Sequence, residues 1–304
     1  MLNVCLPGTG GFMPLVDRWL TCCWIEYQGH AILIDCGEGT QLALKEAGLH
    51  LSRLDMVLVT HFHADHVAGL AGMLLSLGNT GRGQDQPLTI AGPPGLCKII
   101  PALLVIAPLP FPVHLAELSP GEAIPGFGGL SINCMALSHR IPCYGYRVDL
   151  KRKPVFSPER AEALGVPKPF WKRLHSGETV QLPDGRSVSP EQVIERPRAP
   201  ISVSYCTDTL PIPEIAEFAR GADLMIAEGM YGDDAMAEKV AEKKHSLYSQ
   251  SARLAKAAGA KRLWLTHFSP AMQDPEEFLE QTREIFPNTE TGKDGLKIEL
   301  TGEE

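Results

Sequence analysis

The sequence contains no apolar run of the ~20 residues that a membrane-spanning helix needs, which excludes a helical membrane protein. Its first five residues carry no basic side chain, and Pro7 and Gly8 follow soon after, so we expect a first strand and not a signal peptide. None of the eight cysteines stands in a Cys-x-x-Cys pair. We therefore expect buried, reduced thiols in a cytosolic protein, and no cysteine in a metal site.

A surplus of positive charge is also missing. The net charge is −8, which argues against a uniformly basic protein that binds nucleic acid over its whole surface. The exception is residues 151–200, where ten Lys and Arg outnumber six Asp and Glu, a balance of +4 that leaves −12 for the rest of the chain. At 44% apolar and 21% charged residues, the chain otherwise resembles ordinary globular proteins, and 304 residues can bury a large core.

Histidine is scarce, with ten in the chain, yet His61, His63 and His66 fall within six residues, together with Asp65. They follow Met56–Thr60, an apolar run that predicts a buried strand. Because His61 and His63 are two positions apart, their rings point the same way in an extended segment. Asp65 and His66 fall where a helical pattern begins, which turns them toward a second point nearby. Two such points indicate a dinuclear site for a metal such as zinc, whereas a cluster of surface histidines fits this spacing poorly.

Strand and helix patterns alternate in both halves of the chain, with polar residues just after the strand ends. This alternation predicts an α/β protein with two packed sheets covered by helices, and ligands at the carboxyl ends of the strands. The strands that we expect are 2–6, 19–27, 31–35, 56–60, 88–91, 113–118, 131–137, 201–206, 224–227 and 262–266. The helices that we expect are about 37–47, 68–77, 95–106, 212–220, 245–258 and 275–286.

Residues 151–198 interrupt this alternation with many prolines, scattered basic side chains and the aromatic pair Phe170-Trp171. Within them we expect one short helix over Pro158–Leu164. We interpret the segment as an excursion from the globular body. A linker without function is the alternative.

Four side chains near one loop are too few to hold two metal ions, so other ligands should follow other strand ends. His139, Asp208 and His267 each stand just after a predicted strand. A single His or Asp at a strand end is usually a hydrogen-bonded turn residue. The repeated position, with suitable residue types each time, makes these three the candidates for the remaining ligands.

The stretch His61-Phe62-His63-Ala64-Asp65-His66 resembles the HxHxDH motif of the metallo-β-lactamase fold superfamily. The order of motifs resembles the ribonuclease Z family, the tRNA 3′-processing endonucleases, over nearly the whole chain. The other matching stretches are Pro7-Gly8-Thr9-Gly10-Gly11, Ile34-Asp35-Cys36-Gly37-Glu38-Gly39-Thr40-Gln41, Ser138-His139-Arg140, Thr207-Asp208-Thr209, His245-Ser246 and Thr266-His267-Phe268-Ser269.

The resemblance implies a four-layer αβ/βα sandwich made by residues 1–304, with an inserted, protruding arm at 151–198. It also implies two Zn²⁺ per subunit, with Mn²⁺ or another divalent ion as the alternative. The implied ligands are His61, His63 and His139 for one ion, Asp65, His66 and His267 for the other, and Asp208 as the bridge.

The activity that the resemblance implies is removal of 3′ trailers from precursor tRNA in the cytoplasm, by attack of a hydroxide held by the two ions. Asp65 would accept a proton from the attacking water, and His245 would give one to the leaving ribose 3′ oxygen. Glu228 would orient the His245 ring. A capping role is the alternative for His245, and a purely structural role for Glu228. In the implied homodimer, the arm at 151–198 would bind the tRNA body.

Other functions stay open at this point. A hydrolase of small phosphodiesters, such as cyclic nucleotides, could use the same metal site, and the chain could be a non-catalytic RNA-binding relative. All seven ligand positions are filled, which argues against a non-catalytic protein. A thioesterase of glyoxalase type is disfavoured because no basic C-terminal helical domain follows the motif.

Overall fold

The computed structural model describes residues 1–106 and 108–302, and the chain divides into two compact units. The larger one, the sandwich unit, comprises residues 1–149 and 202–304. The smaller one, the small unit, comprises residues 150–201. Within the described ranges, no helix combines the length and the apolar character that crossing a bilayer requires.

The first large sheet of the sandwich unit has seven strands. In spatial order they are β18 (Leu296–Leu300), β1 (Leu2–Gly8), β2 (Cys22–Tyr27), β3 (His30–Ile34), β4 (Leu54–Leu58), β5 (Leu88–Gly92) and β6 (Val113–Glu117). Strands β18 to β3 pair antiparallel, and strands β3 to β6 pair parallel. The strands β3 and β4 are almost wholly buried apolar runs, as expected for parallel strands covered on both faces.

The second large sheet also has seven strands. In spatial order they are β17 (Thr289–Thr291), β16 (Leu263–Thr266), β15 (Leu224–Glu228), β14 (Ile201–Cys206), β9 (Tyr144–Leu150), β8 (Leu130–Ala136) and β7 (Ala123–Pro125). Strands β14 to β17 pair parallel. Every residue of β14, β15 and β16 is buried, so the loops after these strands leave from a rigid part of the core.

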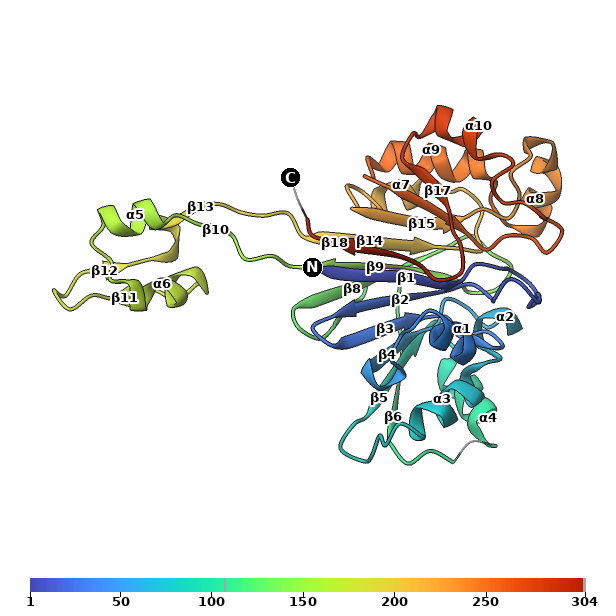
Figure 1. The fold of residues 1–304 in the computed structure, drawn as a ribbon, viewed down its shortest axis with the longest axis horizontal. Coiled ribbons are helices and arrows are strands. Elements are labelled where there is room, and N and C mark those ends of the chain that lie inside the picture. Colours follow the sequence, from blue (N-terminus) through green and yellow to red (C-terminus); the bar gives the residue numbers. More distant parts are fainter. Residues whose placement is uncertain (107, 303–304) are drawn as a thin grey trace. The chain divides into compact units, whose positions relative to one another are not determined.

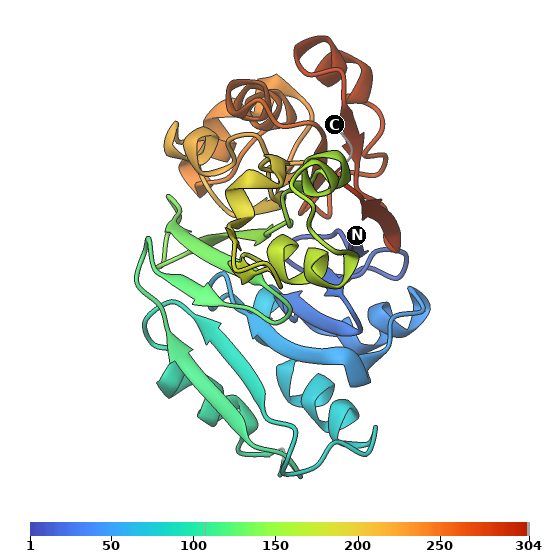
Figure 2. The same cartoon turned by 90° about the vertical axis from the view of Figure 1, so that its left-hand side faces the viewer.

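Helices cover the outer face of each sheet, which produces the four layers of the sandwich unit in Figure 1 and, after a quarter-turn, in Figure 2. On the side of the first sheet they are α1 (Thr40–Glu46), α2 (Ala64–Val67), α3 (Leu70–Gly78) and α4 (Leu96–Leu104). On the side of the second sheet they are α7 (Glu214–Phe218), α8 (Ala237–Lys243), α9 (Tyr248–Ala258) and α10 (Leu279–Ile285). The α/β sandwich predicted from the sequence is confirmed.

The helix expected over 68–77 is present as α3, and the short helix α2, which was not expected, precedes it and meets it at Gly69. A Cβ at Gly69 would lie 1.8 Å from the carbonyl oxygen of Gly37, so only glycine allows this approach. The Gly69 N–H donates to the Cys36 carbonyl (3.0 Å), and the Cys36 N–H donates to the His66 carbonyl (2.8 Å). The short helix α2 is thereby fixed against the loop that follows β3.

Most other expected elements of the sandwich unit are present, with bounds that shift by at most four residues. Strands β7, β9, β17 and β18 and helix α8 of the sandwich unit were not expected from the sequence. Strand β9 is mostly buried and carries Arg147 and Asp149, whose charges hid its apolar pattern.

The small unit has a core of its own. Its elements are β10 (Val155–Phe156), α5 (Pro158–Ala163), α6 (Lys168–His175), β11 (Val180–Gln181), β12 (Ser187–Val188) and β13 (Ile194–Arg196). Strand β10 pairs with β13, and β11 pairs with β12. The buried cluster between them is Ala161, Val166, Leu174, Val180, Leu182, Val188 and Val193. Helix α5 matches the short helix expected there, and Ser157 caps it by accepting a hydrogen bond from the Arg160 N–H (3.2 Å).

Candidate metal centre

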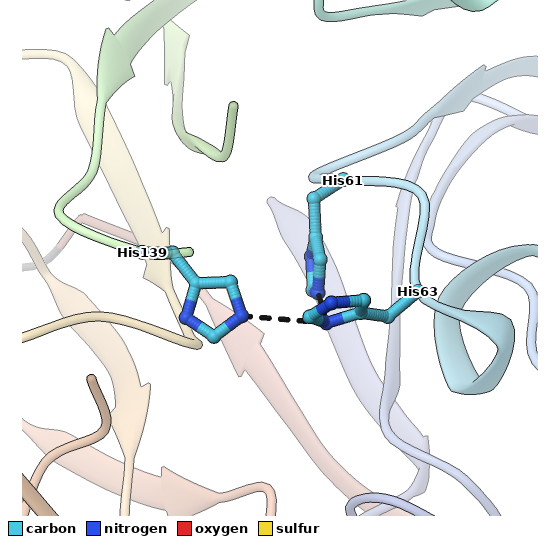
Figure 3. A group of neighbouring side chains, drawn as sticks. All are labelled: His61, His63 and His139. Carbon is cyan, nitrogen blue, oxygen red and sulfur yellow. Dashed lines mark hydrogen bonds between the residues drawn. The ribbon is translucent and has the colours of Figure 1, made fainter. Parts of the chain in front are cut away.

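Three imidazole rings from the two large sheets converge on one point (Figure 3). His61 and His63 follow β4 of the first sheet, and His139 follows β8 of the second. Nε2 of His61 lies 2.9 Å from Nδ1 of His63, and Nε2 of His139 lies 3.3 Å from that same Nδ1. Burial is the main cause that lowers the pKa of all three rings, so they are neutral and keep a lone pair for a metal ion.

A second group lies next to the first and contains carboxylates. Asp65 and His66 come from α2, and His267 directly follows β16. Oδ2 of Asp65 lies 3.5 Å from Nε2 of His66 and 3.5 Å from Nε2 of His267. These three ligand atoms can therefore surround one cation.

Asp208 lies between the two groups. Its Oδ1 is 3.9 Å from Nε2 of His61 in the first group and 3.2 Å from Nε2 of His267 in the second. Its Oδ2 is 3.4 Å from Nε2 of His66. A carboxylate that reaches both groups has the position of a ligand shared by two metal ions.

The carboxylates around the second ligand group favour positive charge on its imidazole rings. Burial alone would lower the pKa of His267, but the carboxylates of Asp208, Asp65 and Glu228 raise it to about 10. Similar surroundings raise the pKa of His66. Burial opposes ionisation of Asp65 as well, yet the neighbouring imidazoles of His267 and His66 hold its pKa below the usual range. The carboxylates thus favour cations at this place, supplied by protons or by metal ions.

Three buried atoms of the centre show that metal ions fit. Nε2 of His66, Nε2 of His267 and Oδ2 of Asp208 have no hydrogen-bond partner in the part of the chain that the structure describes. A buried polar atom without a partner costs ~1–3 kcal/mol. Imidazole nitrogens and carboxylate oxygens are the donors that zinc accepts, so two divalent ions would satisfy these atoms.

Asp35 supports the centre and was missed by the sequence analysis. Its Oδ2 accepts a hydrogen bond from Nδ1 of His66 (2.7 Å), and its Oδ1 accepts one from the Thr60 N–H (2.8 Å). This contact fixes the tautomer of His66 and leaves Nε2 facing Asp208. The signal in the sequence is the stretch Ile34–Gln41, which contains Asp35 and matches a motif of the family.

His139 is held by two hydrogen bonds to Lys244, which lies in the segment before α9. Nδ1 of His139 donates to the Lys244 carbonyl (3.1 Å), and Nζ of Lys244 donates to the His139 carbonyl (2.9 Å). Lys244 has φ +60°, a left-handed conformation that only a few non-glycine residues adopt. The two contacts tie a predicted ligand of the first group to the segment that carries His245.

Glu228 and His245 lie beside the second group. Oε1 of Glu228 accepts from Nδ1 of His245 (2.5 Å) and from Nδ1 of His267 (3.1 Å). Oε2 of Glu228 accepts from the Ser246 N–H (3.0 Å), which keeps this segment out of the helix. The helix expected over 245–258 therefore begins only at Tyr248, and His245 precedes it.

Three residues of the centre have a strained backbone. Asp35, Asp208 and His267 have φ angles of +64°, +56° and +62°. Each lies within two residues of the end of a parallel strand, where the chain must turn sharply to aim a side chain into the centre. Such conformations cost ~1–3 kcal/mol each and are concentrated at functional sites.

A cavity of about 800 Å³ opens onto the centre. Its polar lining includes His63, Asp65, His139, Asp208, His245 and His267. The structure thus brings together the seven predicted ligands, with His245 and Glu228, inside the sandwich unit.

Comparisons with known proteins agree with this architecture. A family model described as anti-Pycsar protein Apyc1 matches residues 2–91, less than a third of the chain. A protein named ribonuclease Z from Agathobacter rectalis is 45% identical over 100% of both chains, and one from Lachnoclostridium phytofermentans is 44% identical over 99% of this chain and 98% of its own.

Two solved structures share the fold. The short form of human tRNase Z superposes with a TM-score of 0.69 at 24% identity, and the metallo-β-lactamase fold protein YhfI from Bacillus subtilis with a TM-score of 0.70 at 18% identity. Each comparison covers 98% of both chains. With full-length relatives of that name well above 30% identity, the chain belongs to the ribonuclease Z family.

Proposed function

We propose that this protein is a metal-dependent endonuclease that removes 3′ trailers from precursor tRNA. The observation that carries the proposal is the convergence of two ligand groups and a bridging aspartate on one open cavity, in a chain whose full-length relatives are named ribonuclease Z. Two bound zinc ions would make water nucleophilic near neutral pH and would neutralise charge on the phosphoryl oxygens.

The chain's own groups have distinct parts in this reaction. His61, His63 and His139 would hold one ion and Asp65, His66 and His267 would hold the other, and Asp208 lies close enough to both groups to serve either ion.

Asp65 accepts the proton of the attacking water. The Phe12 N–H donates to its Oδ2 (2.7 Å), which fixes the orientation of the carboxylate. Its Oδ1 takes no part in that contact or in those with His66 and His267, and so can face the water.

His245 gives a proton to the leaving ribose 3′ oxygen. Its Nδ1 is held by Glu228, and the ring lines the cavity, so Nε2 is the nitrogen that can reach the substrate. An alkoxide is a poor leaving group, and a positioned acid is therefore needed. Glu228 acts as a positioning residue, because its hydrogen bond fixes the orientation of the His245 ring.

The small unit serves as the binding surface for the tRNA body. It carries a local excess of basic residues, and Lys168 and Arg173 lie over the rings of Trp171 and Phe170 at 5.9 Å each. Basic side chains neutralise phosphates, and aromatic rings pack against sugar or base. Residues 151–198 are accordingly the proposed tRNA-binding arm.

The proposal includes a homodimer in the cytoplasm. Helices α1 and α3 expose the apolar side chains of Leu42 and Leu75, which a second copy could cover. Seven of the eight cysteines are buried and all eight are free thiols, as is usual in a reducing compartment. Molar mass in solution, measured by light scattering, tests the dimer.

The deciding experiment is cleavage of a precursor tRNA that carries a 3′ trailer, with zinc content measured on the same sample. We expect one defined cut that leaves a 3′ hydroxyl on the tRNA. Activity on bis-p-nitrophenyl phosphate with no cut in precursor tRNA would instead indicate a hydrolase of small phosphodiesters.

A further inference from the structure

Phe12 is an exposed aromatic side chain beside the metal centre. It is 72% exposed, and the neighbouring Met13 is 47% exposed. Both lie on the loop between β1 and β2, and both line the cavity. Exposed apolar side chains gathered at a functional cavity mark a binding surface.

The backbone of this loop is fixed against the centre. The Phe12 N–H donates to Asp65 (2.7 Å), and the Gly11 N–H donates to the Phe268 carbonyl (2.9 Å). A Cβ at Gly11 would lie 2.7 Å from the His267 ring, so the chain passes in direct contact with that imidazole. Phe12 itself has φ +73°, which a bulky residue adopts only rarely. The fold therefore fixes the backbone that carries this exposed ring, at a cost in backbone strain, next to two of the proposed ligands.

The cavity lining differs between the two ligand groups. Near His139, the lining includes the basic side chains of Arg140 and Lys243. Near Asp65, it includes the apolar ring of Phe12. A nucleic acid strand offers charged phosphates and flat apolar bases. A small diester has a phosphate but no neighbouring nucleotide, and so offers no adjoining base. Basic side chains suit the phosphates, and an aromatic ring suits a base.

We propose that the Phe12 ring stacks on the nucleobase of a nucleotide adjoining the scissile phosphate. The inference rests on the proposed function and adds to it the contact that seats the strand at the metal centre. Every base has a π face, so this contact tolerates any trailer sequence. Because the Phe12 N–H also holds Asp65, the stacked base and the proton acceptor are positioned by one residue.

The first test is the variant Phe12→Asn. Asparagine adopts the left-handed conformation readily, so the loop and its N–H contact to Asp65 are retained while the ring is lost. We expect kcat/KM for precursor tRNA to fall about tenfold or more, the loss typical of a missing base stack, with zinc content unchanged. Val16→Asn is the matched control, because Val16 is fully exposed on the same loop and is not among the described residues that line the cavity.

The second test uses precursor tRNAs that lack the base on one or the other side of the scissile phosphate. On one of these two substrates, the activity of wild-type protein should fall by the same factor that Phe12→Asn causes on intact precursor tRNA. The activity of Phe12→Asn on that substrate should equal its activity on intact precursor tRNA. With 2-aminopurine at that position, wild-type protein should change the fluorescence on mixing, before cleavage, because the base leaves its neighbouring bases for the Phe12 ring, and Phe12→Asn should not.

The outcomes separate this inference from the proposed function. Full activity of Phe12→Asn on precursor tRNA, additive losses on both abasic substrates, or a fluorescence change that is the same in the variant would each overturn the stacking role alone. A wild-type protein that fails to cut precursor tRNA would overturn the proposed function and this inference together.

Discussion

The metal centre and the small unit hold their charges in opposite ways. In the centre, His61, His66 and Asp208 are almost completely buried, and the pKa of each depends on its ionisable neighbours. In the small unit, Arg173 pairs with Glu178 and Arg186 pairs with Asp184, and all four side chains are about half exposed. Breaking a buried charge pair costs ~3–5 kcal/mol, whereas an exposed pair contributes ~0–1 kcal/mol. One substitution can therefore disable the centre, while the small unit should act through the sum of many weak contacts.

The largest effect is expected from Asp65→Ala. Both precursor tRNA and bis-p-nitrophenyl phosphate should be hydrolysed roughly 10³-fold more slowly or worse, since Asp65 is proposed both as a metal ligand and as the proton acceptor. Steady-state rates and metal content check this. Asp55→Ala is the matched control, a partly exposed carboxylate paired with His30 and Arg82, and should keep full activity. Turnover that survives in Asp65→Ala would rule out its role as acceptor.

The second effect distinguishes the two regions directly. Replacing residues 151–198 by a short flexible linker should abolish cleavage of precursor tRNA and spare the small diester. The joint is feasible because β9 and β14 are neighbouring strands, and Ser202 donates to Asp149 across them (2.5 Å). Rates on both substrates, with circular dichroism as the folding control, test this prediction. An equal loss on both substrates would contradict a role in tRNA binding.

The third effect lies within the centre and depends on the leaving group. His245→Ala should lower kcat for precursor tRNA about 10²–10⁴-fold, because the ribose 3′ oxygen needs a proton. Hydrolysis of bis-p-nitrophenyl phosphate should fall much less, since p-nitrophenolate leaves without one. Glu228→Gln should show the same dependence on the leaving group, with a smaller loss of kcat for precursor tRNA, about 10–100-fold. A loss independent of the leaving group would assign His245 to metal binding or structure instead.

The smallest effect is expected from a single change in the small unit. Trp171→Ala should raise KM for precursor tRNA by about tenfold or less, because one ring among many contacts is removed. The kcat value and the small diester should be unaffected. Trp171 donates to the Val166 carbonyl (2.9 Å), so Trp171→Phe serves as the control that keeps the ring and loses this bond. A fall in kcat would mean that the small unit contributes to the chemical step, and the contrast between the two regions would not hold.

Much of the centre was predictable because its ligands occupy positions with a regular meaning. His139, Asp208 and His267 were inferred from a shared place after strand ends, and the structure has all three beside the His61 loop. The orientation of His245 was less predictable. A helical pattern includes it, but the hydrogen bond from Ser246 to Glu228 keeps the segment out of α9.

The sequence by itself determined the alternation of strands and helices, the loop of His61, His63, Asp65 and His66, and the excess of basic residues at 151–200. These features are local, because they depend on spacing and composition within short stretches. Only the tertiary structure decided that Asp35 orients His66 across 31 positions, and that the Phe12 N–H holds Asp65 across 53 positions. Such contacts depend on how strand ends from separate parts of the chain pack together. The pattern of any single segment carries no record of that packing.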